Sequence, residues 1–322
     1  MKNERPFPVL TFCSTGLNKL RAKILRNLRI ISRERYRLAS NKHHAAKVLL
    51  RRPKAGSFPP DAFLYVEFES DRGIGNRLKV LASNLLYFGA RKIRCRWPKE
   101  GWVTASFHDL FSTSSDIEIR EVSEEERSLA AKEARCPALY DEIGGGGVLF
   151  LPPEDYNENV VENDPRNLSE ATKQSYREIF RKFSPSKEVS ERLKNFTLPP
   201  NFVSVQIRNN KDWTDAGRKD PVEPYIEKMR AFPSDTVFFL SAMNQETASK
   251  IRSVFKDRVL ELPGKDYRSM VDAVCDMFIL AKGREGIYAF GSTFCEVAWW
   301  LGGAKQPFSL IGSKSSWKKK KK

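Results

Sequence analysis

From Phe202 onward the chain alternates short apolar runs with amphipathic stretches. This pattern predicts strands near 202–208, 236–241, 258–262, 286–290 and 307–311, and helices near 223–230, 245–255, 268–282 and 293–301. Such alternation is typical of a parallel sheet that helices cover on both faces. We therefore predict a Rossmann-like unit over 201–313.

A first α/β unit is predicted over 58–200. The apolar run that begins at Ala62 indicates a strand, and a glycine-containing turn leads from it into a helix from about Asn76 to Gly89. A strand near 92–97 and helices near 122–135, 169–183 and 186–194 are expected to follow. The prediction is thus an α/β protein of the GT-B type, in which two Rossmann-like domains face a cleft.

The net charge of +16 is concentrated at the two ends of the chain. Residues 1–57 form a predicted basic helical arm, and a basic tail over 314–322 contains five consecutive lysines. Such runs are either solvated ends or weak contacts with an anionic surface, membrane or nucleic acid. No apolar run of about 18 residues stands at the N-terminus, and five scattered cysteines show no paired spacing, so we expect a cytoplasmic protein without a transmembrane segment.

Two segments carry polar groups at predicted strand ends. In the first unit, Gly73, Ile74, Gly75 and Asn76 stand between a strand and a helix, where glycines permit close approach of a ligand to the backbone. A plain turn is the other interpretation. In the second unit, Arg208 follows an apolar strand and could bind a pyrophosphate, or could pair with Asp212 or Asp215.

Two further segments lie late in the second unit. Asp276 is a lone carboxylate within an apolar helix, either satisfied locally or available to a base with adjacent N–H donors. The sequence Gly-Ser292-Thr293-Phe294 leads from a strand into an apolar helix. Its hydroxyl and N–H groups could bind phosphate, or Ser292 or Thr293 could simply cap the helix. Trp299 and Trp300 are expected in the core.

In this order, the four segments resemble the fucosyltransferase superfamily, which includes α1,6-fucosyltransferases and protein O-fucosyltransferases. Gln206-Ile-Arg208 with Asp212-Trp213 is similar to the family's H-x-R-x-x-x-D-W segment, with Gln206 in place of the histidine. The resemblance implies that Gly73–Asn76 approaches the donor, that Asp276 recognises guanine, and that Ser292, Thr293 and Phe294 hold ribose and phosphates.

The resulting hypothesis is an inverting, metal-independent glycosyltransferase that transfers fucose from GDP-fucose to a hydroxyl of a glycan or glycoprotein. Arg208 would be the catalytic residue, since its charge would offset that of the departing diphosphate. The chain contains no Asp-x-Asp metal motif, and no cofactor besides the donor substrate is expected. The alternatives are another nucleotide-sugar donor on the same fold, or a non-catalytic polyanion-binding protein with a degenerate transferase fold.

Overall fold

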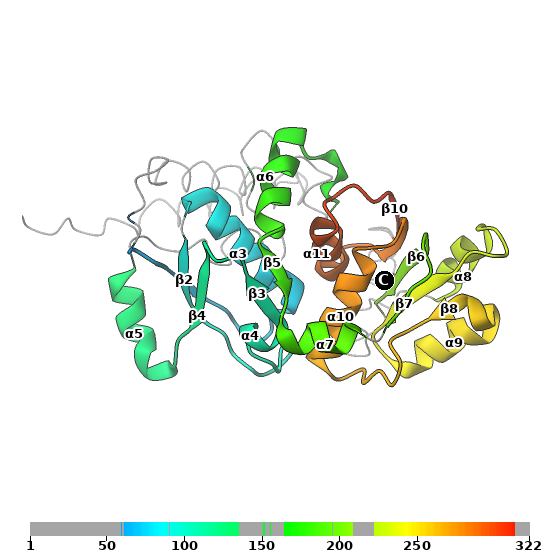
Figure 1. The fold of residues 1–322 in the computed structure, drawn as a ribbon, viewed down its shortest axis with the longest axis horizontal. Coiled ribbons are helices and arrows are strands. Elements are labelled where there is room, and N and C mark those ends of the chain that lie inside the picture. The colour runs from blue at the N-terminus through cyan, green and yellow to red at the C-terminus, as the bar shows by residue number, and fades with distance from the viewer. Residues whose placement is uncertain are drawn as a thin grey trace, which may run out of the picture.

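The computed structural model describes residues 59, 61–89, 91–134, 151, 155, 164–194, 196–208 and 222–312 of the 322-residue chain. These residues form two parallel sheets with helices around and between them (Figure 1). The α/β prediction with two sheet-containing units is therefore confirmed. The predicted basic arm and tail, and the residues Asp212, Trp213 and Asp215, lie outside the described part of the chain.

The first sheet contains three parallel strands in the order β1-β2-β4. Its strands are β1 (Leu64–Glu67), β2 (Lys92–Arg96) and β4 (Glu118–Glu121), with α3 (Ile74–Phe88) between β1 and β2 and α5 (Glu124–Glu133) after β4. The predicted strands and helices of this region are confirmed to within about three residues, apart from β4, which was not predicted. Short elements were also missed, namely α4 (Phe107–Leu110) and the antiparallel pair β3 (Phe111–Thr113) and β5 (Phe183–Pro185).

The second sheet contains five strands in the order β10-β9-β6-β7-β8, and every neighbouring pair is parallel. The strands are β6 (Val203–Ile207), β7 (Phe238–Ala242), β8 (Val259–Leu260), β9 (Glu285–Ala289) and β10 (Phe308–Ile311). The helices are α8 (Glu223–Arg230), α9 (Gln245–Phe255), α10 (Met270–Leu280) and α11 (Thr293–Leu301). This order is that of a Rossmann-type half, with the chain running outward in both directions from the central pair β6 and β9.

Local sequence explains where three helices of the second unit begin. The side chains of Asn244, Ser269 and Ser292 accept hydrogen bonds from backbone N–H groups in the first turns of α9, α10 and α11. Asn and Ser are favoured at this position because they satisfy N–H groups that the helix leaves unpaired. Within the described residues, no helix has both the length and the apolar character needed to cross a bilayer.

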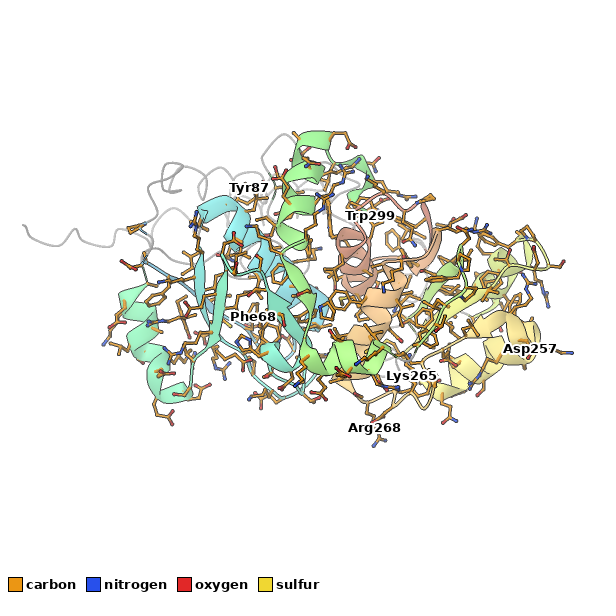
Figure 2. The ribbon with its side chains drawn as sticks, viewed as in Figure 1. Phe68, Tyr87, Asp257, Lys265, Arg268 and Trp299 are labelled. Carbon is orange, nitrogen blue, oxygen red and sulfur yellow. The ribbon has the colours of Figure 1, made fainter. Side chains whose placement is uncertain are left out.

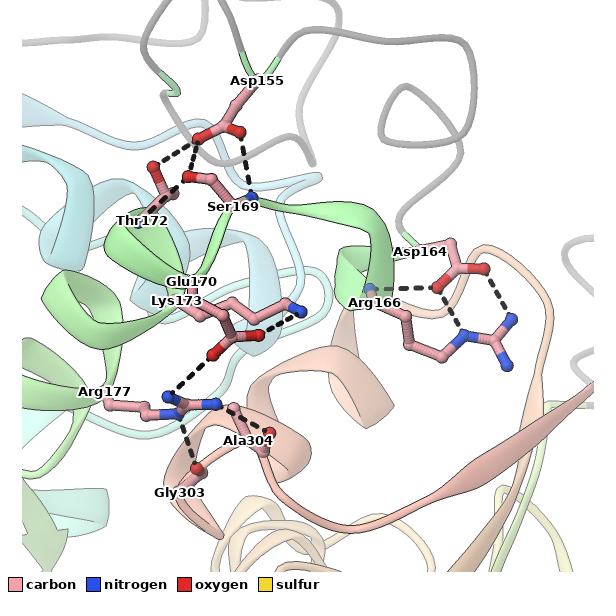
Figure 3. Close-up of polar contacts among 10 residues, drawn as sticks. All are labelled: Asp155, Asp164, Arg166, Ser169, Glu170, Thr172, Lys173, Arg177, Gly303 and Ala304. Atoms are coloured by element: carbon pink, nitrogen blue, oxygen red, sulfur yellow. Dashed lines mark hydrogen bonds and ion pairs between the residues drawn. The ribbon is translucent and has the colours of Figure 1, made fainter.

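Two helices from the middle of the chain connect the first unit to the second through side-chain hydrogen bonds. They are α6 (Glu170–Phe180) and α7 (Lys187–Lys194). Figure 3 shows Arg177 of α6 reaching the segment after α11, where its Nε and Nη2 donate to the carbonyl groups of Gly303 at 3.0 Å and Ala304 at 3.4 Å. From α7, Arg192 Nε donates to Asp272 of α10 at 2.7 Å.

One hydrophobic core extends from the first sheet to the second. It includes Leu64 and Ile93 of the first sheet, Phe239 of the second, and Trp299 and Trp300 of α11. Helices α3, α6, α10 and α11 occupy the space between the sheets in Figure 1. The expectation that both tryptophans lie in the core is confirmed. A separate core fills the far side of the second sheet beneath α8 and α9.

A buried ion pair joins α3 to α11 within the first of these cores. Lys79 Nζ lies 2.5 Å from Glu296 Oε2, and the two side chains are 1% and 4% exposed. Trp300 Nε1 donates to the other oxygen of Glu296 at 3.4 Å. Because burial penalises an unpaired charge strongly, each of these two residues depends on the other.

Replacement of one member of this pair is expected to destabilise the fold severely. Lys79→Met leaves the Glu296 carboxylate buried without its cation, so the free energy of unfolding should fall by about 3–5 kcal/mol. The double variant Lys79→Met/Glu296→Gln removes both charges and should recover part of that loss. Urea unfolding of the two single variants and the double variant measures the coupling, and strictly additive losses would contradict it.

Candidate functional site

The carboxyl ends of β6 and β9 lie side by side at the centre of the second sheet. Gln206 of β6 pairs in register with Tyr288 of β9. The connections that leave these two strands run in opposite directions, because β7 lies beyond β6 and β10 beyond β9. Loops diverge at such a switch point and leave a crevice in which ligands of open α/β sheets bind. Arg208 follows β6 and Ser292 follows β9, so the structure brings these two predicted residues to the switch point.

The end of β6 also contacts the first turn of α11. Cys295 Sγ donates to Gln206 Oε1 at 2.8 Å, and both side chains are buried. Burial raises the pKa of the Cys295 thiol to about 12, while the hydroxyl of Ser292 and the positive charge of Arg208 act in the opposite direction. Arg208 therefore lies close enough to Cys295 for its charge to affect the thiol.

The N-terminus of α11 combines a satisfied cap with backbone donors. Ser292 is buried and its Oγ accepts from Cys295 N at 3.5 Å, so the capping interpretation of Ser292 is confirmed. Thr293 and Phe294 are only partly buried. Their N–H groups lie in the first helical turn, where no earlier carbonyl of the helix can accept them. The positive end of the helix dipole adds to the attraction of this end for an anion.

The N-terminus of α3 lies directly against that of α11. A Cβ atom on Gly75 would lie 2.7 Å from the carbonyl carbon and oxygen of Thr293 and 2.9 Å from the nitrogen of Phe294. Only glycine permits this approach of two backbones. Gly73 precedes the helix in an extended conformation and offers no side chain as a cap. Ile74 and Asn76 complete the turn, and the Asn76 Oδ1 atom is buried with no hydrogen-bond partner among the described residues.

Arg77 holds the turn before α3 in place, a role that the sequence analysis missed. Its fully buried side chain donates through Nε to the carbonyl of Arg72 at 3.0 Å and through Nη1 to that of Pro98 at 2.9 Å. The guanidinium carbon lies 4.7 Å from the centroid of the Trp97 ring. Burial lowers the pKa of Arg77 to about 10. Arg77 thus ties the loop after β1 to the loop after β2.

Asp276 lies on α10, which packs against β6 and β7. Its side chain is 2% exposed and its Oδ2 accepts from Lys265 Nζ at 2.5 Å. Burial raises the pKa of Asp276 to about 6, and Lys265 and the hydroxyl of Ser241 oppose this effect. Ser241 of β7 pairs in register with Gln206 of β6. Asp276 therefore belongs to the same edge of the sheet. Its Oδ2 is bound to a lysine, whereas its Oδ1 is buried with no hydrogen-bond partner among the described residues.

A pocket of about 660 Å³ opens at this edge beyond β7 and β8. Its lining comes from the residues that follow β7, Met243–Gln245, from those that follow β8, and from the segment Gly264–Arg268. Figure 2 labels Lys265 and Arg268 in this segment, between β8 and α10. The volume is typical of a site for a small molecule or cofactor. Lys265 lines the pocket, whereas Asp276 lies behind it.

The structure therefore brings most of the predicted site residues to the carboxyl ends of the two sheets. Gly73–Asn76 and Ser292–Phe294 belong to two helix starts that touch, while Gln206 and Arg208 join them from β6 and Asp276 stands beside them. The sequence analysis missed Lys79, Glu296 and Lys265. Glu296 is detectable in principle, since it is the single charged residue of the apolar helix α11, whereas Lys79 shares α3 with Arg77. Lys265 follows a Pro-Gly turn and has no such signal.

Comparisons with known proteins place the chain near solved fucosyltransferases. No protein-family model matches it, and no curated protein matches its sequence. It is similar to fucosyltransferase NodZ from Bradyrhizobium, with 15% identity, a TM-score of 0.46, and coverage of 74% of this chain and 92% of NodZ. For POFUT1 in complex with GDP the values are 11%, 0.45, 79% and 100%. For a variant of Arabidopsis thaliana FUT1 in complex with GDP they are 13%, 0.47, 94% and 80%. At these identities and TM-scores, the similarity assigns no role to any residue of this chain.

The contact between the two helix starts leads to a prediction for Gly75. Gly75→Ala places a methyl group against the backbone of Thr293 and Phe294, so the helices must separate and the free energy of unfolding should fall by about 1–3 kcal/mol. Gly73→Ala is the matched control, because its Cβ would have no neighbour within 4 Å and its backbone is extended. Its cost should stay below about 1 kcal/mol. Equal losses in thermal or urea unfolding would contradict the close contact.

Proposed function

We propose that this chain is a glycosyltransferase that transfers a sugar from a nucleoside diphosphate sugar to a hydroxyl of a glycan or protein acceptor. The observation that carries the proposal is the meeting of two helix N-termini, α3 and α11, at the switch point where Arg208 leaves β6. Two positive helix ends in contact are electrostatically unfavourable unless an anion lies near them. A diphosphate supplies such an anion.

The chemistry of transfer suits this arrangement. The bond between the anomeric carbon and the β-phosphate oxygen breaks, and its electron pair stays with the departing nucleoside diphosphate. The acceptor oxygen forms the new bond on the opposite face of the sugar, which inverts its configuration. Negative charge grows on the diphosphate during this step, so fixed donors aimed at it stabilise the transition state more than the ground state. We assign this role to Arg208 and to the N–H groups of Gly75 and Thr293.

The nucleoside is expected to lie along the same edge, in the pocket beyond β7 and β8. Neighbouring strands are about 4.8 Å apart, so these strands lie about 5–10 Å from β6. If the diphosphate of a nucleotide lies at the switch point, its base can therefore lie in the pocket. The volume of about 660 Å³ is compatible with that occupant.

The first donor to test is GDP-fucose, because the order of the motifs resembles that of fucosyltransferases. Gln206 stands where that family has a histidine, and an amide can donate or accept a hydrogen bond but does not transfer protons at neutral pH. We therefore assign Gln206 to binding of the donor. Its Oε1 already accepts from Cys295, which leaves its amide N–H groups for the ligand.

Replacement of Arg208 tests the proposed transfer. Arg208→Ala removes the positive charge that we place next to the diphosphate. The kcat for release of GDP from GDP-fucose should therefore fall by about 100-fold or more. Arg230→Ala, at an exposed position in the last turn of α8, is the matched control and should behave like wild type. Equal turnover of the Arg208 variant and wild type would remove Arg208 from the mechanism.

A panel of nucleotide sugars separates the proposed function from its alternatives. Turnover of a different donor in place of GDP-fucose would keep the reaction and change the substrate. Failure of wild type to bind or turn over any donor would overturn the proposed function. Salt-sensitive binding of polyanions that is lost when residues 1–57 and 314–322 are removed would then support the non-catalytic alternative.

We also propose that transfer requires no divalent ion. Arg208 and the two helix N-termini supply the positive charge that a metal ion supplies in other transferases. Turnover should therefore be unchanged within about twofold when EDTA is present in excess. A large loss that added Mg²⁺ or Mn²⁺ restores would contradict this assignment. The release of free GDP over time is the measurement, with and without chelator.

A further inference from the structure

Lys265 is one of several charged residues that line the pocket, together with Arg252, Glu261, Asp266 and Arg268. Its side chain is 6% exposed and lines the pocket. The ammonium donates to Asp276 Oδ2 at 2.5 Å and to the carbonyl of Ala242 at 3.3 Å. An ammonium has three N–H donors and no acceptor. The third N–H of Lys265 therefore has no hydrogen-bond acceptor among the described residues.

The surroundings of Lys265 hold it in one position. Its Nζ lies 5.0 Å from the centroid of the Tyr267 ring, and the Tyr267 hydroxyl donates to Glu261 Oε1 at 2.9 Å. Glu261 in turn pairs with Arg252 at 3.2 Å. Lysine side chains usually lose considerable conformational entropy when they bind a ligand. Here that loss has already occurred in the folded protein, so the third donor is preorganised.

We infer that Lys265 reads the base of the bound nucleotide by donating its third N–H to a carbonyl oxygen of that base. The inference rests on the proposed function, because it takes the nucleotide into this pocket. Asp276 is not part of the pocket lining, but it binds the ammonium of Lys265. Asp276 therefore affects recognition of the base indirectly, as the counter-ion that holds Lys265 in position. Lys265 is thus a specificity residue, and Asp276 is its positioning partner.

A donor-only group selects among bases by the acceptors on their edges. Guanine presents O6 and N7, both acceptors, whereas adenine presents an amino donor in the place of O6. The ammonium of Lys265 should therefore favour guanine over adenine. If instead the carboxylate of Asp276 bound guanine directly, it would need the ring N1–H and the 2-amino group as donors. The two arrangements therefore use different groups of the same base.

Inosine diphosphate distinguishes the two arrangements on the wild-type protein. Hypoxanthine keeps O6, N7 and N1–H but lacks the 2-amino group. Titration calorimetry with GDP, inosine diphosphate and ADP should give dissociation constants for the first two within about threefold of each other, and a value for ADP at least about tenfold higher. Binding of inosine diphosphate as weak as that of ADP would overturn the inference.

Variants provide a second and independent measurement. Lys265→Met should weaken GDP binding by about tenfold or more and bring the GDP and ADP affinities within about threefold. The double variant Lys265→Met/Asp276→Asn removes the buried carboxylate that the single change leaves unpaired, and its base preference should be equally small. Lys282→Met, at an exposed position after α10, is the control and should bind like wild type. Thermal unfolding of each protein verifies that it is folded.

The outcomes separate this inference from the proposed function. A double variant that keeps the wild-type ratio of GDP to ADP affinity would overturn the role of Lys265, while turnover of a guanine nucleotide sugar would still support the transferase. Failure of wild type to bind any of the three nucleotides would overturn the proposed function, and the inference with it.

Discussion

The contact between the first turns of α3 and α11 is the constraint on which the rest of this structure depends. The backbone of Gly75 lies so close to that of Thr293 that a side chain would not fit, and the Lys79–Glu296 ion pair holds the two helices together deeper in the core. The first contact places two positive helix ends at the carboxyl edges of both sheets. The second resists their separation. The same two helices, α3 and α11, therefore provide the proposed anion site and hold the two sheets together.

Most of the second unit could be predicted from sequence because its pattern is local. The strands β6 and β7 are buried on both faces and are mostly apolar, and helices such as α9 begin at a recognisable cap, Asn244. The strand pair β3 and β5 could not be predicted in this way. Each strand has three residues, and their pairing depends on residues about 70 positions apart in the sequence. Such pairs are stabilised by packing rather than by propensity.

The site was predictable in part for a related reason. Arg208 and Ser292 stand at the ends of predicted strands, and parallel strands bring such ends to one edge of a sheet. The order of strands, which places β9 beside β6, follows from packing and left no signal in the motifs themselves. The partner of Asp276 was also hidden. Lys265 is eleven residues away across a loop, and only the folded chain shows that the carboxylate faces a lysine.

The hydrogen bonds between α6 and the segment after α11 affect how the chain could be split into two fragments. Arg177 binds the carbonyl groups of Gly303 and Ala304, and the hydrophobic core runs without a break from one sheet to the other. A cut between Pro200 and Asn201 would expose the apolar surfaces of α3 on one fragment and of α10 and α11 on the other. The two pieces would then be stable only when produced together, as a split protein that reassembles through its own interior.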